Sequence, residues 1–268
     1  MFEQMKKIKG KLSVVGLGPG CADLITPRAI SAIESADLVV GLDELLAQVE
    51  HLLPGKEVVT SSRSEEVPRA LAAVSAALKG RRVALLASGD PGVYSIGSLA
   101  QAALRDQSWH RGSSSQFEII PGIPSAQSCA SLIGVPLGHD NCTISLSDLL
   151  SSWDDIKSKI AFAARADFAI TLYNPSGKNS QNQMVEVREI LLQHLSACVP
   201  VAIIKSAYQP DQSIVLSDLM HFLAHNIDGD STVIIGNTRS YIYEGLMGTH
   251  RGYGETYDLV TGELRKAD

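Results

Sequence analysis

The chain has 268 residues, of which 45% are hydrophobic and 19% are charged, and its formal net charge is −6. This length and composition favour a folded globular protein with a sizeable buried core. The negative charge, without a basic cluster interleaved with aromatic residues, argues against nucleic acid as a partner. No apolar run approaches the roughly 18 residues that span a bilayer, so a membrane-spanning protein is not expected.

The start of the chain and its cysteines bear on location. Residues 1–11 are basic, but the apolar block that follows, Leu12 to Val15, is too short for the apolar region of a secretory signal. Cys21, Cys129, Cys142 and Cys198 form no C-x-x-C pair and no set with histidine at metal-ligand spacing. We therefore predict a cytoplasmic protein with reduced thiols and no metal site.

Short apolar runs alternate with longer segments of helical spacing, which is typical of a parallel sheet covered by helices. Strands predicted in the first half are Leu12 to Val15, Leu38 to Val40, Glu57 to Val59, Arg82 to Ala87 and Phe117 to Ile120. A helix is expected to start at Thr26-Pro27, because a threonine hydroxyl can cap free N–H groups and proline suits the first helical position.

The alternation restarts in the second half of the chain. Strands are predicted at Cys142 to Leu146, Phe168 to Leu172, Val199 to Ile204 and Thr232 to Ile235, and helices at Trp153 to Ala164, Gln183 to His194 and Ser217 to His225. Pro121-Gly122-Ile123-Pro124 breaks the pattern between the halves. We predict an α/β fold of two α/β domains with mainly parallel sheets, at residues 1–121 and 122–268.

Glycine-rich turns follow two strands of the first half. Gly16-Leu17-Gly18-Pro19-Gly20 lets the backbone approach a ligand closely. Its third glycine comes too early for G-x-G-x-x-G, so it does not indicate a pyrophosphate site, and a turn without a ligand is the alternative. Ser88-Gly89-Asp90-Pro91-Gly92-Val93-Tyr94-Ser95 follows another strand, where Asp90-Pro91 is either part of a binding loop or an ordinary helix cap.

Small and polar residues follow the remaining strands. Pro121 to Ser128 leaves N–H groups and hydroxyls available for a carboxylate or a ribose, or serves close helix packing. Ser145 to Leu150, Leu172 to Pro175 and Gly236 to Thr238 place polar groups after strands of the second half. Asp148 is a base, a hydrogen-bonding partner or a helix cap. The lack of H-E-x-x-H and G-x-S-x-G patterns disfavours zinc and serine hydrolase chemistry.

Six segments, read in order, resemble the tetrapyrrole (corrin and porphyrin) methylase family over residues 12 to 253: G-L-G-P-G, S-G-D-P-G-V-Y, P-G-I-P-S-A, S-L-S-D-L-L, L-Y-N-P and T-V-I-I-G-N. Within that family the chain is most similar to the precorrin-3B and cobalt-factor III C17-methyltransferases. The resemblance implies S-adenosylmethionine as the cofactor, S-adenosylhomocysteine as its product, and methylation of a tetrapyrrole with ring contraction on the route to cobalamin.

The resemblance also implies a cofactor cleft between two α/β domains, and commonly a homodimer. Positions that match the family's cofactor contacts are Pro19, Gly89, Asp90, Val93, Ser125, Ala126, Asn174, Ala207 and Thr232. Positions expected to reach the substrate are Ser145, Ser147 and Asp148, of which Ser147 and Asp148 are the candidates for catalysis.

Other functions remain open at this point. Another tetrapyrrole methylase, such as uroporphyrinogen-III methyltransferase, shares much of the pattern. A dinucleotide-dependent oxidoreductase predicts an acid roughly 20 residues beyond the first glycine loop, where Asp43 stands. A noncatalytic ligand-binding protein would leave the several loops at strand ends unexplained.

Overall fold

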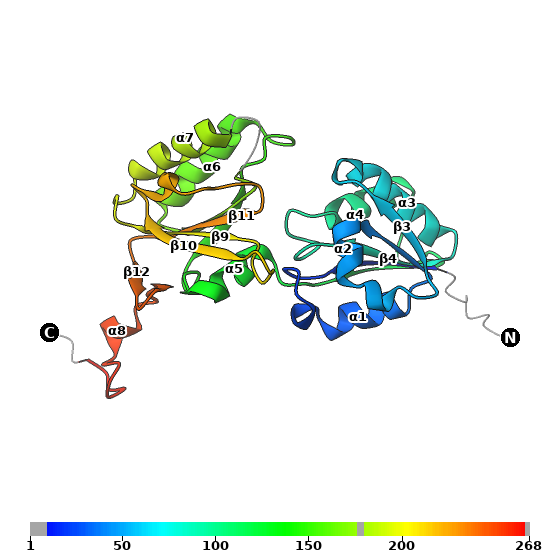
Figure 1. Cartoon of the computed structure of the whole chain (residues 1–268), viewed down its shortest axis with the longest axis horizontal. Coiled ribbons are helices and arrows are strands. Elements are labelled where there is room, and N and C mark those ends of the chain that lie inside the picture. The colour runs from blue at the N-terminus through cyan, green and yellow to red at the C-terminus, as the bar shows by residue number, and fades with distance from the viewer. Residues whose placement is uncertain (1–9, 176–179, 266–268) are drawn as a thin grey trace. The chain divides into compact units, whose positions relative to one another are not determined.

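The computed structural model describes residues 10–175 and 180–265 (Figure 1). The chain divides into two compact units, residues 1–125 and 126–268. No helix among the described residues is long and apolar enough to cross a membrane.

The first unit is built on a five-stranded sheet of order β3-β2-β4-β1-β5, in which every pair is parallel. Its strands are β1 (Gly10–Gly16), β2 (Leu38–Leu42), β3 (Glu57–Ser61), β4 (Arg82–Ala87) and β5 (Ser115–Ile120). Its helices are α1 (Pro27–Glu34), α2 (Asp43–Gln48), α3 (Glu66–Leu78) and α4 (Gly97–Asp106), with short 3-10 turns η1 (Ala22–Leu24), η2 (Glu50–Leu52) and η3 (Arg63–Glu65).

Both faces of the central strands of this sheet, β2, β4 and β1, are buried, as is usual in parallel sheets. Leu12 and Val14 of β1 pack in the cluster that includes α3 and α4, whereas Val15 packs with α1 and α2 on the other face. Thr26 caps α1 by accepting a hydrogen bond of 3.2 Å from the N–H of Ala29, and proline follows it. The helix start predicted from the sequence is thereby confirmed.

The second unit contains a five-stranded sheet of order β10-β9-β11-β8-β7 and a small sheet of order β12-β13-β6. The large sheet comprises β7 (Asn141–Ser145), β8 (Ala169–Tyr173), β9 (Pro200–Lys205), β10 (Ser213–Asp218) and β11 (Ser231–Ile235). The small sheet comprises β6 (Gly134–Val135), β12 (Ser240–Tyr243) and β13 (Leu246–Thr249). The helical elements are α5 (Ser125–Ile133), α6 (Trp153–Arg165), α7 (Ser180–Leu192), η4 (Phe222–Ala224) and α8 (Tyr253–Thr256).

The α/β class is confirmed, but strand direction in the second unit differs from the expectation. Only β7 and β8 pair in parallel in its large sheet, and the three other pairs are antiparallel. The helix predicted at Ser217 to His225 is wrong, because that segment holds the end of β10 and the short η4. Without a crossover helix, β10 and β11 each return alongside their neighbours in the opposite direction.

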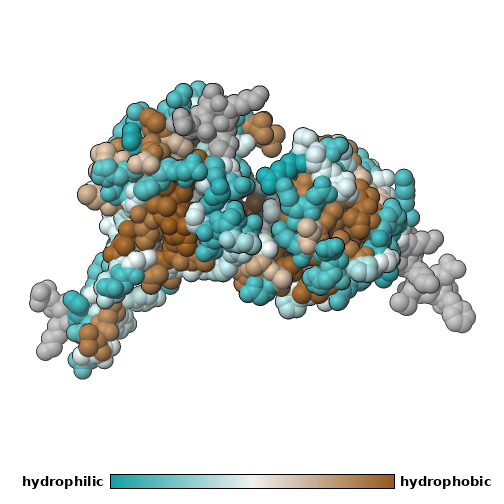
Figure 2. Space-filling view, viewed as in Figure 1, coloured by the Kyte–Doolittle hydropathy of each residue, from teal (hydrophilic) through white to brown (hydrophobic). Residues whose placement is uncertain are grey.

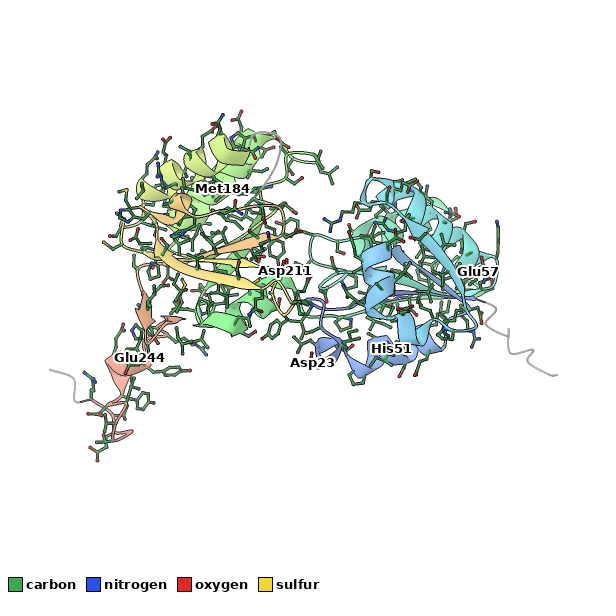
Figure 3. All side chains as sticks on the ribbon, in the orientation of Figure 1. Asp23, His51, Glu57, Met184, Asp211 and Glu244 are labelled. Carbon is green, nitrogen blue, oxygen red and sulfur yellow. The ribbon has the colours of Figure 1, made fainter. Side chains whose placement is uncertain are left out.

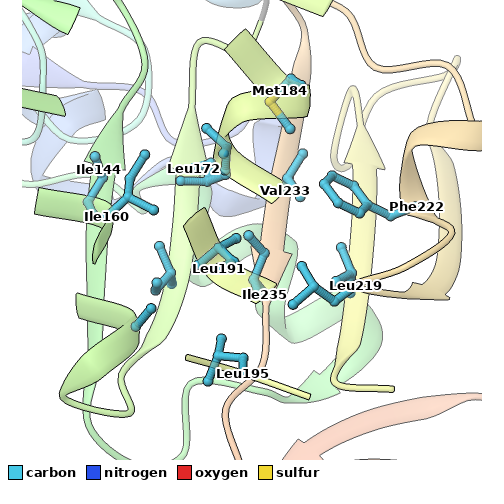
Figure 4. Close-up of a cluster of buried hydrophobic side chains, with 14 of the residues drawn as sticks. Ile144, Ile160, Leu172, Met184, Leu191, Leu195, Leu219, Phe222, Val233 and Ile235 are labelled. Carbon is cyan, nitrogen blue, oxygen red and sulfur yellow. The ribbon is translucent and has the colours of Figure 1, made fainter. Parts of the chain in front are cut away.

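Helices cover both faces of this large sheet. On one face α6 and α7 bury Ile160 and Leu191 against strand residues such as Val233 (Figure 4). On the other face α5 contributes Cys129 and Ile133 to a second cluster. Phe222 of η4 completes the first cluster and is wholly buried.

Replacing Phe222 with alanine is expected to lower the free energy of unfolding by about 3–5 kcal/mol, because the side chain leaves a cavity in a closed core. Phe162 on α6 is 68% exposed, so Phe162→Ala is the matched control, with an expected change below about 0.5 kcal/mol. Urea unfolding followed by circular dichroism measures both. Equal losses in the two variants would contradict the assignment of η4 to the core.

Candidate functional site

Three loops of the first unit lie at one edge of its sheet. Loop A (residues 17–20) follows β1, loop B (residues 88–95) follows β4, and loop C (residues 121–124) follows β5. Because β4, β1 and β5 are parallel neighbours, their carboxyl ends meet at the same edge, where ligands bind in open α/β sheets.

Loops A and B are joined through their backbones. The N–H of Gly89 donates to the carbonyl of Gly18 at 2.9 Å, and the N–H of Gly18 donates back to Gly89 at 3.2 Å. The N–H of Leu17 donates to the carbonyl of Ala87 at 2.9 Å, which continues the strand pairing into the loops. The two loops therefore have a fixed mutual position.

The Asp90 carboxylate joins loop B to loop C. Its Oδ1 accepts a hydrogen bond of 2.7 Å from the N–H of Gly92, and its Oδ2 accepts one of 3.2 Å from the N–H of Gly122. Helix α4 begins only at Gly97, after Ile96 at its N-cap position. The helix-cap interpretation of Asp90 is therefore wrong, and its side chain holds two loops together.

Two glycines allow the three loops to come this close. A Cβ at Gly122 would lie 2.1 Å from the carbonyl oxygen of Gly89, and a Cβ at Gly16 would lie 2.6 Å from the same oxygen. Both clashes are with backbone, which cannot move aside as a side chain can. Packing of the loops against one another by itself requires glycine at both positions.

The predicted cofactor residues of this unit lie in loop A, in loop B and at the start of α5, and none lies in loop C. Gly89 is buried, while Pro19, Asp90, Val93 and Ser125 are half-buried. Beside Val93, the exposed Tyr94 has a φ of 49°, a left-handed conformation that is costly for a bulky residue and that clusters at functional sites. The sequence carries no signal for this conformation.

Asp43, the acid that a dinucleotide site would use, is engaged by a residue of the protein itself. Asp43 begins α2 directly after β2, and its Oδ1 accepts a hydrogen bond from the hydroxyl of Thr60. The carboxylate thus links α2 to the end of β3.

Predicted residues of the second unit also gather at one sheet edge. Strands β7 and β8 are parallel, and β11 runs opposite to both β8 and β9, so β7, β8 and β9 share one direction. Ser145, Asn174 and Ala207 lie at or just beyond the ends of these three strands. Thr232 joins them from the beginning of β11, where it pairs with Ile204.

Side-chain contacts connect the first two strand ends. The Asn174 amide donates to the hydroxyl oxygen of Ser145 at 2.9 Å, and the N–H of Ser147 donates to the same oxygen at 3.3 Å. Asn174, Ser206 and Tyr208 have φ values of 53°, 48° and 61°. Three left-handed residues after β8 and β9 mark this edge as a place where local strain is maintained.

Tyrosines connect helix α5 to the same edge. The hydroxyl of Tyr173 accepts a hydrogen bond of 2.7 Å from the N–H of Ala126 in the first turn of α5, and the hydroxyls of Ser131 and Tyr208 lie 2.8 Å apart. Ala126 is buried in the first turn of α5. In the sequence, Tyr173 stood out only as one residue of the polar segment Leu172 to Pro175, and no signal pointed to Tyr208.

Asp148 lies in an exposed loop after β7. Its Oδ2 accepts a hydrogen bond of 3.3 Å from the amide of Gln183, a buried residue of α7. Ser152 caps α6 by accepting a hydrogen bond of 3.2 Å from the N–H of Asp155. The interpretation of Asp148 as the cap of that helix is therefore wrong, and no sequence signal pointed to Gln183.

An ion pair holds the end of β9 to the turn before β11. Lys205 Nζ lies 2.7 Å from Asp228 Oδ2, and the hydrogen bond from Lys205 lowers the pKa of Asp228 below its usual value. The loop that follows β9 contains Asp211, labelled in Figure 3, which accepts a hydrogen bond from the Ser206 hydroxyl. These contacts fix the chain on either side of Ala207.

The chemistry offered by both edges is mainly that of backbone groups, hydroxyls and amides. Within the described ranges, no group of three or more His, Cys, Asp or Glu side chains could hold a metal ion. Burial raises the pKa of the Cys129 thiol to about 11, so this cysteine is protonated and a poor nucleophile at neutral pH. Such edges are suited to holding and orienting ligands.

Comparison with known proteins identifies the family of this chain. The sequence model of the Tetrapyrrole (Corrin/Porphyrin) Methylases matches residues 11–222. The chain belongs to this methylase family. This confirms the resemblance deduced from the six sequence segments.

Relatives of this methylase carry more specific names. A "Cobalt-factor III methyltransferase" of Priestia megaterium is 41% identical over 94% of this chain. This chain spans about half of that relative, 47% of its length. A "Probable cobalt-factor III C(17)-methyltransferase" of Salmonella typhimurium is 36% identical over 90% of this chain and 99% of its own. The crystal structure of the methyltransferase CobJ superposes with a TM-score of 0.81 at 32% identity, covering 90% of this methylase and all of CobJ.

Replacing Gly122 with alanine is expected to lower the free energy of unfolding by about 3 kcal/mol, since the new Cβ overlaps the backbone of loop B. Gly55→Ala is the control, because Gly55 has a φ of 79° but open space around it, and only the backbone conformation costs about 1 kcal/mol. Urea unfolding of both variants tests the interlock. A smaller loss for Gly122→Ala than for Gly55→Ala would contradict it.

Proposed function

We propose that this chain is an S-adenosylmethionine-dependent methyltransferase that methylates C17 of precorrin-3B or cobalt-factor III, with ring contraction, in cobalamin biosynthesis. The observation that carries the proposal is the similarity to the Salmonella protein named "Probable cobalt-factor III C(17)-methyltransferase", which aligns with this chain over 99% of its own length. The methyltransferase CobJ, at 32% identity over 90% of this chain, supports the methyltransferase activity.

The donor set of the two edges fits this cofactor. A nucleoside and an amino-acid group are bound by backbone N–H and carbonyl groups and by hydroxyls, which the loops present in fixed positions. S-adenosylmethionine supplies a methyl group that its sulfonium already activates.

The residues proposed to bind the cofactor come from both units. Direct contacts are proposed for Pro19, Gly89, Val93 and Ser125 of the first unit and for Ala126, Asn174, Ala207 and Thr232 of the second. Asp90 is assigned an indirect role, because both of its carboxylate oxygens are engaged by backbone N–H groups of loops B and C. It keeps the loops in the shape that binds the ligand.

Ser145, Ser147 and Asp148 are proposed to contact the tetrapyrrole. Ser145 is already oriented by Asn174, and Asp148 by Gln183. Methyl transfer to an electron-rich ring carbon needs alignment more than proton transfer, and alignment alone can supply up to about 7–11 kcal/mol. Ser147 and Asp148 are the candidates for proton transfer in the ring contraction.

Isothermal titration calorimetry with S-adenosylhomocysteine and with NAD tests the cofactor. Binding of S-adenosylhomocysteine alone is expected, whereas binding of NAD alone would overturn the methyltransferase proposal. Methyl transfer from S-adenosylmethionine to precorrin-3B and to cobalt-factor III is then measured separately. Turnover of neither corrin, by protein that binds the cofactor product, would overturn the proposed substrate.

The role of Asp90 is tested with the same calorimetry. Asp90→Ala frees loops B and C from each other, so the affinity for S-adenosylhomocysteine is expected to fall about tenfold or more, with a stability loss of only about 1 kcal/mol. Asp90→Asn keeps one hydrogen-bond acceptor, so its affinity for S-adenosylhomocysteine should lie between those of the wild type and the alanine variant. If Asp90→Ala instead lost as much free energy of unfolding as binding free energy, Asp90 would be a purely structural residue.

We also propose that the chain forms a homodimer and works in the cytoplasm. The small sheet and the C-terminal segment of the second unit expose large apolar side chains: Val135, Ile242, Tyr243, Leu246, Tyr253, Leu259, Val260 and Leu264. Apolar atoms are visible on this part of the molecule in Figure 2. Clusters of this kind support self-association, and four free thiols suit a reducing compartment.

Sedimentation velocity tests the dimer. The wild type is expected at twice the chain mass of 28.6 kDa, and the double variant Tyr243→Glu, Leu246→Glu is expected as a monomer, because these cross-strand neighbours would place like charges in the apolar contact. Val67→Glu with Leu71→Glu on α3 is the control and should remain dimeric. A monomeric wild type would overturn the proposal.

A further inference from the structure

Tyr173 is the last residue of β8 and makes hydrogen bonds in two directions. Its hydroxyl accepts a hydrogen bond of 2.7 Å from the N–H of Ala126, and its carbonyl accepts one of 2.9 Å from the N–H of Leu146. Across the sheet it is paired with Ser145, the last residue of β7. One residue therefore joins the start of α5 to the end of β7.

The first of these bonds lies in the first turn of α5. The first N–H groups of a helix have no partner within the helix, and a buried one that stays unpaired is costly. The N–H of the buried Ala126 is paired with a hydroxyl that lies 47 positions later in the chain. Farther along α5, Cys129 and Ile133 pack in an apolar cluster. Apolar packing is not directional, so the bond to Tyr173 adds a directional contact at the helix start.

The second bond lies beside the groups proposed to contact the substrate. Leu146 directly follows Ser145, whose hydroxyl oxygen accepts hydrogen bonds of 2.9 Å from the Asn174 amide and 3.3 Å from the N–H of Ser147. Asn174, the neighbour of Tyr173, has a φ of 53°. The end of β8 is thus bonded to residues 145–146 through both the Tyr173 carbonyl and the Asn174 side chain.

We propose that Tyr173 is a positioning residue, which fixes the cofactor-binding start of α5 against the substrate-binding end of β7. This inference rests on the proposed function, in which Ala126 contacts the cofactor and Ser145 the tetrapyrrole. Methyl transfer requires sulfur, methyl group and ring carbon to be in line, and a misplacement of about 1 Å can cost about 100-fold in rate. Tyr173 acts through Ala126 and Ser145, because its hydroxyl and its carbonyl hold the two binding segments at a fixed separation.

Tyr173→Phe tests this role, because it removes the hydroxyl and keeps the ring. In methyl transfer to cobalt-factor III and to precorrin-3B, kcat is expected to fall about tenfold or more, since alignment is lost. KM for the corrin and Kd for S-adenosylhomocysteine should change by less than about threefold, because the direct contacts remain.

Hydrogen exchange measured by NMR tests the contact itself, independently of activity. In Tyr173→Phe the Ala126 amide should exchange faster than in wild type, because its hydrogen-bond acceptor is gone. The Leu146 amide should exchange at the wild-type rate, since its acceptor is the backbone carbonyl of residue 173.

Ser131→Ala is the matched control, because it removes another hydroxyl contact of α5, the one of 2.8 Å with Tyr208. Its kcat should equal that of wild type. A wild-type kcat in Tyr173→Phe would overturn the inference and leave the proposed function standing. So would a fall in kcat that is matched by an equal loss of folded protein in circular dichroism, or by an equal fall in Ser131→Ala. Wild-type protein that binds no S-adenosylhomocysteine and methylates neither corrin would overturn both.

Discussion

The backbone contact between loops A, B and C is the constraint on which the first unit's site depends. Gly18 and Gly89 exchange hydrogen bonds, and Asp90 accepts one from Gly122. These contacts require glycine at positions 16 and 122, where a Cβ would overlap backbone. The edge is therefore shaped by the chain itself, and a ligand that binds there does not have to order the loops first.

The second unit reaches a comparable arrangement by a different route. Because β11 runs opposite to β8 and β9, it begins where they end, and Thr232 joins Ser145, Asn174 and Ala207 at one edge. In an all-parallel sheet, the start of that strand would lie at the opposite edge. Strand direction, rather than any local motif, brings Thr232 to the site.

Both edges combine polar groups with strained backbone. Tyr94 in loop B and Asn174 and Tyr208 in the second unit adopt left-handed conformations, each stabilised by surrounding structure at a cost of about 1–3 kcal/mol. Such strain fixes side chains in place without supplying acid or base. This is consistent with a methylase, whose reaction depends on orientation of an already activated group.

The amino-acid sequence determined the α/β class, most strands, the start of α1 and the methylase family, because apolar periodicity, capping residues and glycine motifs are local features. It placed Asp90 in a functional loop but did not reveal what its side chain holds. The direction of β10 and β11, the hydrogen bond from Gln183 to Asp148 and the bond from Ala126 to Tyr173 were decided by tertiary structure. β10 pairs with β9 across the short loop 206–212, whereas the other contacts join residues distant in the chain, and their pairing depends on how the sheet and helices pack.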